Sequence, residues 1–575
     1  MAPPRVPRPD AKPPFGGLVL AQLTSMLYQP WRDKLVASAY DVKQPVRSRQ
    51  ILEGLSSGVE IGYVGSRRMQ RRAPNHGSAT KNPRVAAKIS QIIGADVAAG
   101  KKAGPFKTAP FEFFSASPLG AVPKKPEEGC VQVETDIRVI HDLSHPFGGN
   151  SVNNYSVDVP LQLDGFDKAI EIVTRLGRGC YLSKLDVKAA YKLVPVRYED
   201  WHLLGFQWEG QYYYERTLPF GLKSSCRQWE WYATAINHFI RVLVGAVDSI
   251  HYVDDFLLAN KNKTIAREHL AGALGIFDDL GAFTAPEKTK GPTRRLVYLG
   301  VEIDTRLMTA RLPDVKLREL ARLLSVVWGS YKTKATRAEL QSLCGKLNWA
   351  AQVVRPGRTY LRRIIDHMKQ HHRKPRGAYP ITLKVQADIR WWREHLACSN
   401  GVSLLYEAEW VNSHKIELTT DACNTGWGAS FGDRWIKGVW TPDEWAASRG
   451  DNPKNDDPAS RSMPYLEFLA VVYAAAACTW GHLWHRKRIL FHCDATAAVC
   501  SMNSGTSRSP AIMTLVRGLH ALCAQHNFDF RSAHIPGARN VAADALSRDA
   551  MQEFFRVRPT ANKTMDKLGV LPLLF

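Results

Sequence analysis

Two adjacent carboxylates, Asp254 and Asp255, lie in the segment SIHYVDDFLLAN, with apolar residues on both sides. The pattern predicts a β-hairpin with the two acids at its turn. Aspartates are common in surface turns, where they form local hydrogen bonds. Here the apolar flanks predict a buried hairpin, and buried carboxylates need cationic partners or metal ions.

A third acid, Asp186, follows the β-rich run in CYLSKLDVKAAY and precedes a chain reversal into a helical segment. We expect Asp186 and Asp254 to be the principal ligands of one site, with Asp255 beside them. Two Mg²⁺ ions in such a site activate a primer hydroxyl and stabilise the departing pyrophosphate. Mn²⁺ is compatible with the same ligands.

Four more acids occur at the ends or beginnings of predicted elements in the C-terminal part. Asp421 ends a strand, Glu467 begins a helix, Asp494 ends another strand and Asp544 starts the last helix. Each acid alone is compatible with a helix cap or a turn. The set of four in one strand-rich region needs a common explanation.

Composition limits the class of protein. The 575 residues exceed what one hydrophobic core organises, so several domains are expected. Lys and Arg exceed Asp and Glu by 23, which favours a polyanion such as nucleic acid as partner, although charge alone also fits a general role in solubility. The ten cysteines form no Cys-x-x-Cys pair, and no apolar run is long enough to span a membrane. We expect a cytoplasmic or nuclear protein without a membrane partner.

The elements that position these acids differ along the chain. Residues 106–304 alternate β-rich and helical runs, as expected for an α+β domain with an antiparallel sheet. Residues 313–366 show helical spacing with many basic residues. After residue 413, KIELTTD, WGASF and RWIKGVW predict three strands, followed by a helix near Pro464 and a strand in RILFHCD.

The first set of acids resembles the active site of reverse transcriptases. LDVKAAY is similar to motif A of that family, and YVDD at 252–255 is similar to its Tyr-x-Asp-Asp box. LPFGLKSS, TAPEKT and VYLGVEID resemble motifs B, D and E, while SPLGAVPKK and IRVIHDLS resemble the fingers region.

The resemblance implies further roles. Tyr191 matches the aromatic steric gate, whose ring clashes with a 2′-hydroxyl and favours deoxynucleotides; the alternative is an ordinary buried tyrosine. Lys288 matches a proton donor to pyrophosphate, with an ordinary exposed lysine as the alternative. Val187 is expected to contact the metal together with Asp186 and Asp254. The implied nucleotide contacts are Lys124, Lys125, Arg138, Tyr191, Phe220, Gly221 and Lys288.

The second set of acids resembles the ribonuclease H family, which gathers such acids on one sheet to hold two metal ions for hydrolysis. The closing segment AHIPGARNVAADALSR is similar to the final motif of that family. The resemblance implies that His534 helps to release product and that Asn540 contacts the substrate backbone or its 2′-hydroxyl. Asp421, Glu467, Asp494 and Asp544 are the implied metal ligands.

Together the resemblances imply an α+β multidomain fold: a right-hand polymerase with fingers, palm and thumb, followed by a ribonuclease H-like mixed β/α domain. The expected domains are a partly disordered N-terminal extension (1–105), fingers and palm (106–312), thumb (313–366), connection (367–413), ribonuclease H domain (414–548) and C-terminal tail (549–575).

The implied function is RNA-directed DNA synthesis by two-metal transfer, with hydrolysis of the RNA strand of RNA–DNA hybrids. The partners would be an RNA template, a DNA primer, the hybrid and deoxynucleoside triphosphates; the oligomeric state is not predicted. IGYVG, KKAGPF, SPLGAVPKK and HDLSHPFGGNSVNN most resemble DIRS-type retrotransposons. Two alternatives stay open: a polymerase segment of a long-terminal-repeat element, and a domesticated, non-catalytic nucleic-acid-binding scaffold.

Overall fold

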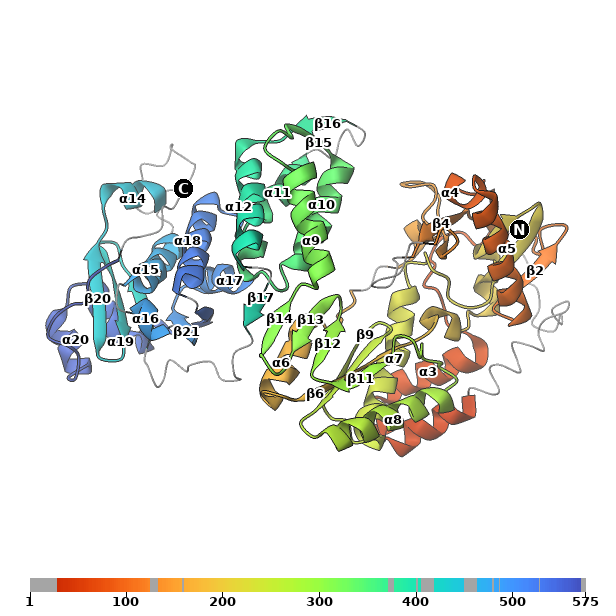
Figure 1. Cartoon of the computed structure of the whole chain (residues 1–575), viewed down its shortest axis with the longest axis horizontal. Helices are drawn as coiled ribbons and strands as arrows, with labels where there is room; N and C mark the ends of the chain where they lie inside the picture. The colour runs from red at the N-terminus through yellow and green to blue at the C-terminus, as the bar shows by residue number, and fades with distance from the viewer. Residues whose placement is uncertain are drawn as a thin grey trace, which may run out of the picture. The chain divides into compact units, whose positions relative to one another are not determined.

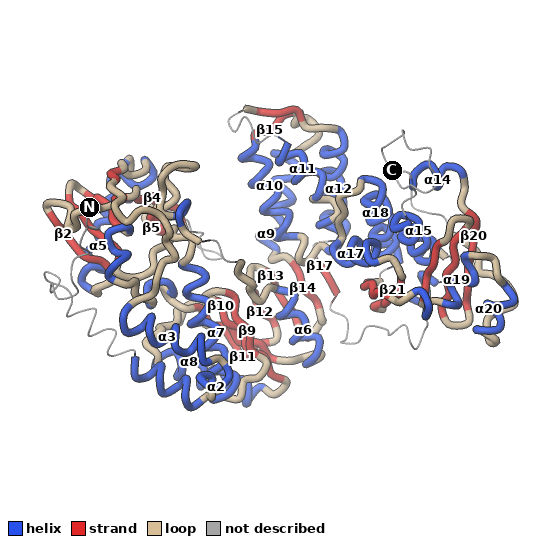
Figure 2. The backbone as a smooth tube through the Cα atoms, turned by 180° about the vertical axis from the view of Figure 1, so that it is seen from behind, coloured by secondary structure: helices blue, strands red, loops and turns tan. Residues whose placement is uncertain are grey.

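The computed structural model describes residues 28–124, 133–157, 160–370, 377–399, 402–404, 418–448, 463–477, 480–484, 487–526 and 528–569 (Figures 1 and 2). The chain forms two compact units. Unit 1 comprises Met1–Ile172 and Cys180–Leu296, and unit 2 comprises Val173–Gly179 and Val297–Phe575. The chain passes between the units within helix α6 (Phe166–Leu176), between Gly179 and Cys180, and within strand β12 (Arg295–Tyr298).

Unit 1 contains a five-stranded sheet in the order β1-β3-β7-β8-β2, a four-stranded sheet in the order β11-β6-β10-β9, and the hairpin β4-β5. The strands are β1 (Arg71–Arg72), β2 (Lys102–Phe106), β3 (Ser115–Ala116), β4 (Leu119–Pro123), β5 (Ile137–His141), β6 (Tyr181–Asp186), β7 (Gly205–Trp208), β8 (Gln211–Glu215), β9 (Ser249–Tyr252), β10 (Asp255–Asn260) and β11 (Lys290–Thr293). The helices are α2 (Tyr40–Lys43), α3 (Pro45–Ser57), α4 (Gly77–Thr80), α5 (Pro83–Ala98), α7 (Ser225–Leu243) and α8 (Lys263–Asp279), with short 3₁₀ turns η1 (Asn153–Tyr155), η2 (Ala190–Leu193) and η3 (Tyr198–Leu203).

Helices α7 and α8 pack on the four-stranded sheet. Asn262 caps α8 by accepting hydrogen bonds from the backbone of Thr264 and Ile265, so the helix begins directly after β10. Phe256 of β10 and Phe277 of α8 meet edge to face with ring centroids 5.0 Å apart, and both are fully buried. This packing fixes the strand that carries Asp255.

The N-terminal segment is part of the core of unit 1. Trp31 packs edge to face on Tyr232 of α7, with ring centroids 5.3 Å apart, and on Phe239. Ile51 and Leu55 of α3 are buried in the same cluster, and α3 lies beside α7 in both views (Figures 1 and 2). The sequence predicts only an extension here, and its first 27 residues lie outside the described part of the chain.

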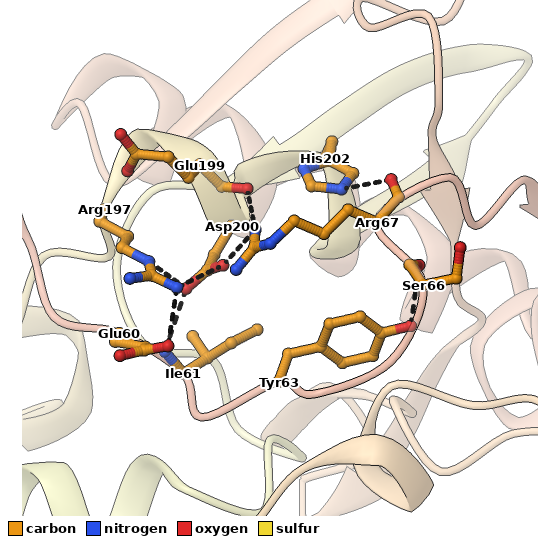
Figure 3. A network of polar contacts seen from close by, with 9 residues as sticks. All are labelled: Glu60, Ile61, Tyr63, Ser66, Arg67, Arg197, Glu199, Asp200 and His202. Carbon is orange, nitrogen blue, oxygen red and sulfur yellow. Dashed lines mark hydrogen bonds and ion pairs between the residues drawn. The ribbon is translucent and has the colours of Figure 1, made fainter. Parts of the chain in front are cut away.

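A buried carboxylate anchors the segment that contains IGYVG (Figure 3). Asp200 in η3 is fully buried and accepts hydrogen bonds from the backbone of Ile61 and from Arg67 and Arg197. Arg197 also binds Glu60 at 2.9 Å. Both guanidinium groups compensate the buried charge, so this part of the N-terminal segment is tied to η3 of unit 1.

The first part of unit 2 is largely helical. It holds the sheet β12-β13-β14-β17 and the hairpin β15-β16. Thr336 and Glu339 form a capping box that starts α10, and α9 to α11 fall in the basic region that was predicted to be helical. The elements are β13 (Val301–Asp304), β14 (Thr309–Arg311), β15 (Lys334–Thr336), β16 (Ala378–Pro380), β17 (Val402–Leu404), α9 (Asp314–Arg322), the π-helix η4 (Leu323–Val327), α10 (Arg337–Ala350), η5 (Arg355–Arg358), α11 (Arg362–Gln370) and α12 (Leu383–Ser399).

The C-terminal part of unit 2 has a five-stranded sheet in the order β20-β19-β18-β21-β22. The β18-β19 and β19-β20 pairs are antiparallel, whereas β18-β21 and β21-β22 are parallel. The elements are β18 (Thr419–Ala422), β19 (Gly426–Phe431), β20 (Arg434–Val439), β21 (Arg488–Cys493), β22 (Asp529–His534), α14 (Pro442–Ser448), α15 (Met463–Ala476), α16 (Trp480–Trp484), α17 (Thr496–Ser504), α18 (Pro510–His526), η7 (Gly537–Arg539), α19 (Val541–Ser547) and α20 (Met551–Val557).

Alternation along β19 separates the two faces of this sheet. Trp427 and Ala429 belong to the core that contains α15, whereas Gly428 faces α19. A Cβ on Gly428 would lie 2.3 Å from the Cβ of Leu546, so a glycine is needed for α19 to approach the strand. Within the described residues, no helix is both long and apolar enough to cross a membrane.

Candidate active sites

Three carboxylates meet at one end of the four-stranded sheet in unit 1. β9 and β10 form the predicted hairpin, and Val253 in its turn has φ +56°. β6 pairs antiparallel with β10, so Asp186 lies opposite Asp255. The backbone N–H of Val187 donates to the carbonyl oxygen of Asp254 at 2.9 Å. Asp186, Asp254 and Asp255, called the palm carboxylates below, therefore come together as predicted.

The palm carboxylates repel one another. Burial raises the pKa of Asp254 to about 6, and the charges of Asp255 and Asp186 add to the shift. Lys288 lies 3.0 Å from Asp186, and Lys184 lies 2.8 Å from Asp255. Crowded oxygen ligands with excess negative charge fit Mg²⁺, because a divalent cation relieves this repulsion.

Three of the predicted nucleotide contacts cluster. The rings of Tyr191 and Phe220 have centroids 5.2 Å apart, and the guanidinium of Arg138 lies 5.3 Å from the centroid of Phe220. Burial is the main cause that raises the pKa of Tyr191, whose hydroxyl shares a hydrogen bond with the thiol of Cys226. Gly221, with φ +110°, follows Phe220. These side chains form one wall that a nucleotide can contact.

The remaining predicted contacts are distributed differently. Lys124 binds Asp136 across the β4-β5 hairpin at 2.9 Å. Lys125 lies outside the described residues. The side chain of Val187 is buried, and its predicted metal contact stays a prediction. Lys184, which the sequence analysis missed, shares the face of β6 with Asp186 through the two-residue period of a strand.

Three of the four acids in the C-terminal part share a buried neighbourhood. The backbone N–H of Ala422, next to Asp421, donates to Glu467 at 3.1 Å. Asp494 follows β21 directly, and the ligand atoms of Glu467, Cys493 and Asp494 lie within 4.8 Å of one another. The acids come from β18, α15 and the end of β21, as the sequence predicts.

Asp544, the fourth acid of this set, comes from helix α19. It lies in the first turn of α19, which is followed by α20 and so is not the last helix as predicted. Its charge helps to raise the pKa of Asp421, and Arg548 binds it at 2.7 Å. Asp421, Glu467, Asp494 and Asp544 are called the C-terminal carboxylates below.

Burial is the main cause of the altered acidity in this site. It raises the pKa of Glu467 to about 10 and that of Asp421 to about 7, and neighbouring carboxylates add to both shifts. Burial also raises the pKa of the Cys493 thiol, so Cys493 stays protonated and is a poor ligand for a hard cation. One oxygen of Asp494 is buried without a hydrogen-bond partner among the described residues. The carboxylate oxygens thus fit Mg²⁺.

Of the two other side chains predicted for this site, Asn540 contacts one of the acids, and His534 is placed by the strand register. Asn540 is buried, and its amide donates to the Thr420 carbonyl at 2.9 Å and to Asp421 at 3.3 Å. It therefore orients Asp421, and a contact with substrate stays a prediction. His534 is exposed at the end of β22, opposite Cys493 in the strand register. Ser547, which was not among the predicted site residues, donates to Asp421 at 2.6 Å and lies one helical turn after Asp544.

Comparisons with known proteins agree with the first site. Residues 132–303 match the family described as reverse transcriptase (RNA-dependent DNA polymerase). The transposon Tf2-3 and Tf2-4 polyproteins of Schizosaccharomyces pombe are 21% identical to this chain over 473 residues. The match covers 80% of this chain and 30% of each relative, so the chain spans less than a third of their length.

Solved structures with similarity include foamy viral protease-reverse transcriptases. One, in complex with double-stranded DNA, has a TM-score of 0.47 at 14% identity and covers 93% of this chain and 84% of that chain. Another, with an RNA/DNA hybrid, has a TM-score of 0.39 at 13% identity, covering 85% and 79%. Residues 132–303 are therefore similar to the reverse transcriptase family. The mixed helices and sheets of the two units confirm the predicted α+β multidomain fold class.

Proposed function

We propose that the protein is an RNA-directed DNA polymerase of a retrotransposon that also hydrolyses the RNA strand of RNA–DNA hybrids. The observation that carries the polymerase assignment is the meeting of the palm carboxylates at one sheet end, inside the segment that matches the reverse transcriptase family. The natural partners are then an RNA or DNA template, a DNA primer and deoxynucleoside triphosphates.

In the polymerase reaction, two Mg²⁺ ions would supply charge neutralisation and activation of the primer hydroxyl. Asp186 and Asp254 would hold these ions, with Asp255 beside them. Lys288 is hydrogen-bonded to Asp186, where an ammonium group can give a proton to the leaving pyrophosphate. Tyr191 would lie under the sugar and exclude a 2′-hydroxyl, and Arg138 would bind phosphate oxygens.

The C-terminal carboxylates support hydrolysis as the second activity. Asp421 and Glu467 are held by Asn540, Ser547 and the backbone of Ala422, so their oxygens are oriented before a cation arrives. Mg²⁺ bound there would generate the attacking hydroxide. The exposed His534 can accept or release a proton as the product leaves.

The net charge of +23 suits a polyanionic duplex. We propose that the chain belongs to the DIRS-type branch, on the basis of IGYVG, KKAGPF, SPLGAVPKK and HDLSHPFGGNSVNN. We also propose that it acts in the cytoplasm or the nucleus. The similarity to transposon polyproteins supports the alternative of a polymerase segment from a longer polyprotein. A non-catalytic scaffold is the remaining alternative.

Two substitutions separate the proposed activities. Asp254→Asn should abolish primer extension and leave hybrid cleavage intact, whereas Asp494→Asn should do the reverse, because each removes charge from a different metal site. Matched controls are Asp279→Asn and Asp549→Asn, whose side chains are 56% and 74% exposed. Loss of both activities in either test variant would contradict separate sites, and tight hybrid binding without either activity in the wild type would favour the scaffold.

A further inference from the structure

Unit 1 contains a group of buried charged side chains. The group includes Lys192, the residue after Tyr191, whose ring forms a wall of the proposed nucleotide site together with Phe220. Glu215 on β8 is 3% exposed. Its two oxygens lie 2.5 Å from Nζ of Lys192 in η2 and 3.2 Å from Nζ of Lys102 on β2. Lys102 also binds Asp96 of α5 at 2.5 Å. The group therefore links four elements of unit 1 through one central carboxylate.

The charges of this group balance. Burial opposes ionisation of Glu215, but Lys102 and Lys192 outweigh it and lower its pKa to about 2. Burial lowers the pKa of His141 to about 4, so its ring is neutral at pH 7. Two carboxylates and two ammonium groups then share the site. Apolar side chains can often replace buried ion pairs without loss of stability, so stability alone does not explain the group.

On one side, Glu215 holds the residue next to Tyr191. Lys192 and Tyr191 are neighbours in the 3₁₀ turn η2. The flanking chain also pairs with the extension of β8, because Val196 donates to the carbonyl oxygen of Arg216 at 2.7 Å. The bond between Lys192 and Glu215 therefore adds a side-chain link between β8 and the turn that carries Tyr191.

On the other side, Glu215 lies near His141, whose backbone holds the loop of Phe220 and Gly221. Nδ1 of His141 lies 4.0 Å from Glu215, and its Nε2 is 3.0 Å from the carbonyl oxygen of Gly205. The backbone N–H of His141 donates to the carbonyl oxygen of Phe220 at 2.9 Å. A Cβ on Gly221 would lie only 2.1 Å from the carbonyl oxygen of His141, so this loop and β5 are in close contact.

The same loop is held from a second direction. The side-chain amide of Asn153 donates to the carbonyl oxygen of Gly221 at 2.8 Å and accepts from the backbone N–H of Lys223 at 2.9 Å. Asn153 and His141 thus hold the Phe220 side of the wall. The link between Glu215 and Lys192 holds the turn η2, which carries the Tyr191 side.

We propose that Glu215 is a positioning residue for the nucleotide site, which fixes Tyr191 through Lys192 and thereby sets the preference for deoxynucleotides over ribonucleotides. This inference rests on the proposed polymerase function. A steric gate rejects a 2′-hydroxyl only if its ring cannot move away, and a displacement of about 1 Å is enough to change rates about 100-fold. The same displacement would open space for a ribose.

The test uses a charge-balanced pair of substitutions in the full-length protein. Glu215→Gln alone leaves a surplus positive charge in the buried group and should lower stability. Glu215→Gln with Lys192→Met retains the pair of Asp96 and Lys102, so the group is neutral again, but η2 has lost its side-chain link to β8. The matched control is Glu171→Gln with Lys168→Met, which removes an ion pair whose side chains are 58% and 51% exposed.

Single-nucleotide primer extension gives kcat/KM for a deoxynucleotide and for the matching ribonucleotide. We expect the double variant to recover most of the thermal stability lost in Glu215→Gln, while its deoxynucleotide preference falls about tenfold or more. The exposed-pair control should keep the wild-type preference. Glu215→Asp, which keeps the charge but shortens the side chain, should show an intermediate loss of preference.

Different results would contradict the positioning role of Glu215 and the polymerase function on which it rests. A folded double variant, or a folded Glu215→Asp variant, with wild-type preference would overturn the positioning role. A wild-type protein that extends no primer with either nucleotide would instead refute the polymerase function itself. A preference that recovers together with stability in the double variant would mean that the buried group has only a structural role.

Discussion

Substitution of Glu467 by Gln should stabilise the metal-free protein. Glu467 is 3% exposed, and burial together with Asp421 and Asp494 raises its pKa to about 10. The folded protein therefore binds a proton at this site far more tightly than the unfolded chain does. Holding the proton at pH 7, against an ordinary pKa of 4.5, costs on the order of 3 kcal/mol.

The sign of the pH dependence follows from the raised pKa. Between pH 4.5 and the pKa of the folded state, the unfolded chain releases the proton that the folded protein retains. The contribution of Glu467 to stability therefore falls as pH rises, by about 1.4 kcal/mol per pH unit. Gln does not ionise, and its amide oxygen can still accept from Ala422 while its amide nitrogen donates to the neighbouring Asp494. The variant should lack this slope.

Hydrogen exchange followed by mass spectrometry measures the effect locally. In EDTA at pH 7, peptides from residues 463–477 should exchange about 100-fold more slowly in the variant, and the difference should shrink toward pH 5. Peptides from residues 249–260 in unit 1 are the internal control. Mg²⁺ should protect the wild type more than the variant. Equal or faster exchange in the variant in EDTA would refute the assignment of a strained, metal-binding carboxylate to Glu467.

Three further predictions concern other positions. The affinity of the palm carboxylates for Mn²⁺ should rise from pH 5 to about 6.5 and then level off, because Asp254, with a pKa of about 6, must lose its proton to bind a cation; a flat profile in an electron paramagnetic resonance titration would contradict this. Gly221→Ala should lower kcat/KM for deoxynucleotide incorporation at least about tenfold, because φ is +110° and the added Cβ meets a carbonyl oxygen; wild-type kinetics would argue against a fixed loop. Asp388→Ala should destabilise unit 2 by about 3–5 kcal/mol in urea, because Asp388 is 1% exposed and Arg517 on α18 binds it at 3.0 Å. Asp366→Ala, at a partly exposed pair on one helix, should cost less than about 1 kcal/mol, and similar losses in both variants would exclude a buried clamp.

The carboxylates could be predicted from sequence because their positions are encoded locally. Asp186 ends β6, Asp494 directly follows β21 and Asp254 lies in the turn between β9 and β10, and the course of each strand determines where its acid lies. Family motifs then indicated which strands meet. The strand register determines the rest, because the pairing of β6 with β10 places Asp186 opposite Asp255.

Contacts between distant segments could not be predicted in this way. Asp200 binds Ile61 and Arg67 across more than 130 positions in the chain, and no local pattern marks Asp200 as buried. Glu215 likewise looks like an ordinary polar residue at a strand end until β2 and η2 lie beside it. The hydrogen bond from the Asn540 amide to Asp421 was likewise not predicted, while the predicted contact of Asn540 with substrate stays a prediction. Buried polar groups depend on tertiary partners that local periodicity does not record.

In the proposed function, one chain both copies RNA and cleaves it. The most direct measurement is a single reaction of the wild-type protein with Mg²⁺, deoxynucleotides, a DNA primer labelled with one dye and an RNA template labelled with another. The account predicts primer extension accompanied by template cleavage, with both lost in EDTA and restored by Mg²⁺. Binding of the hybrid without extension or cleavage, with either Mg²⁺ or Mn²⁺, would contradict it.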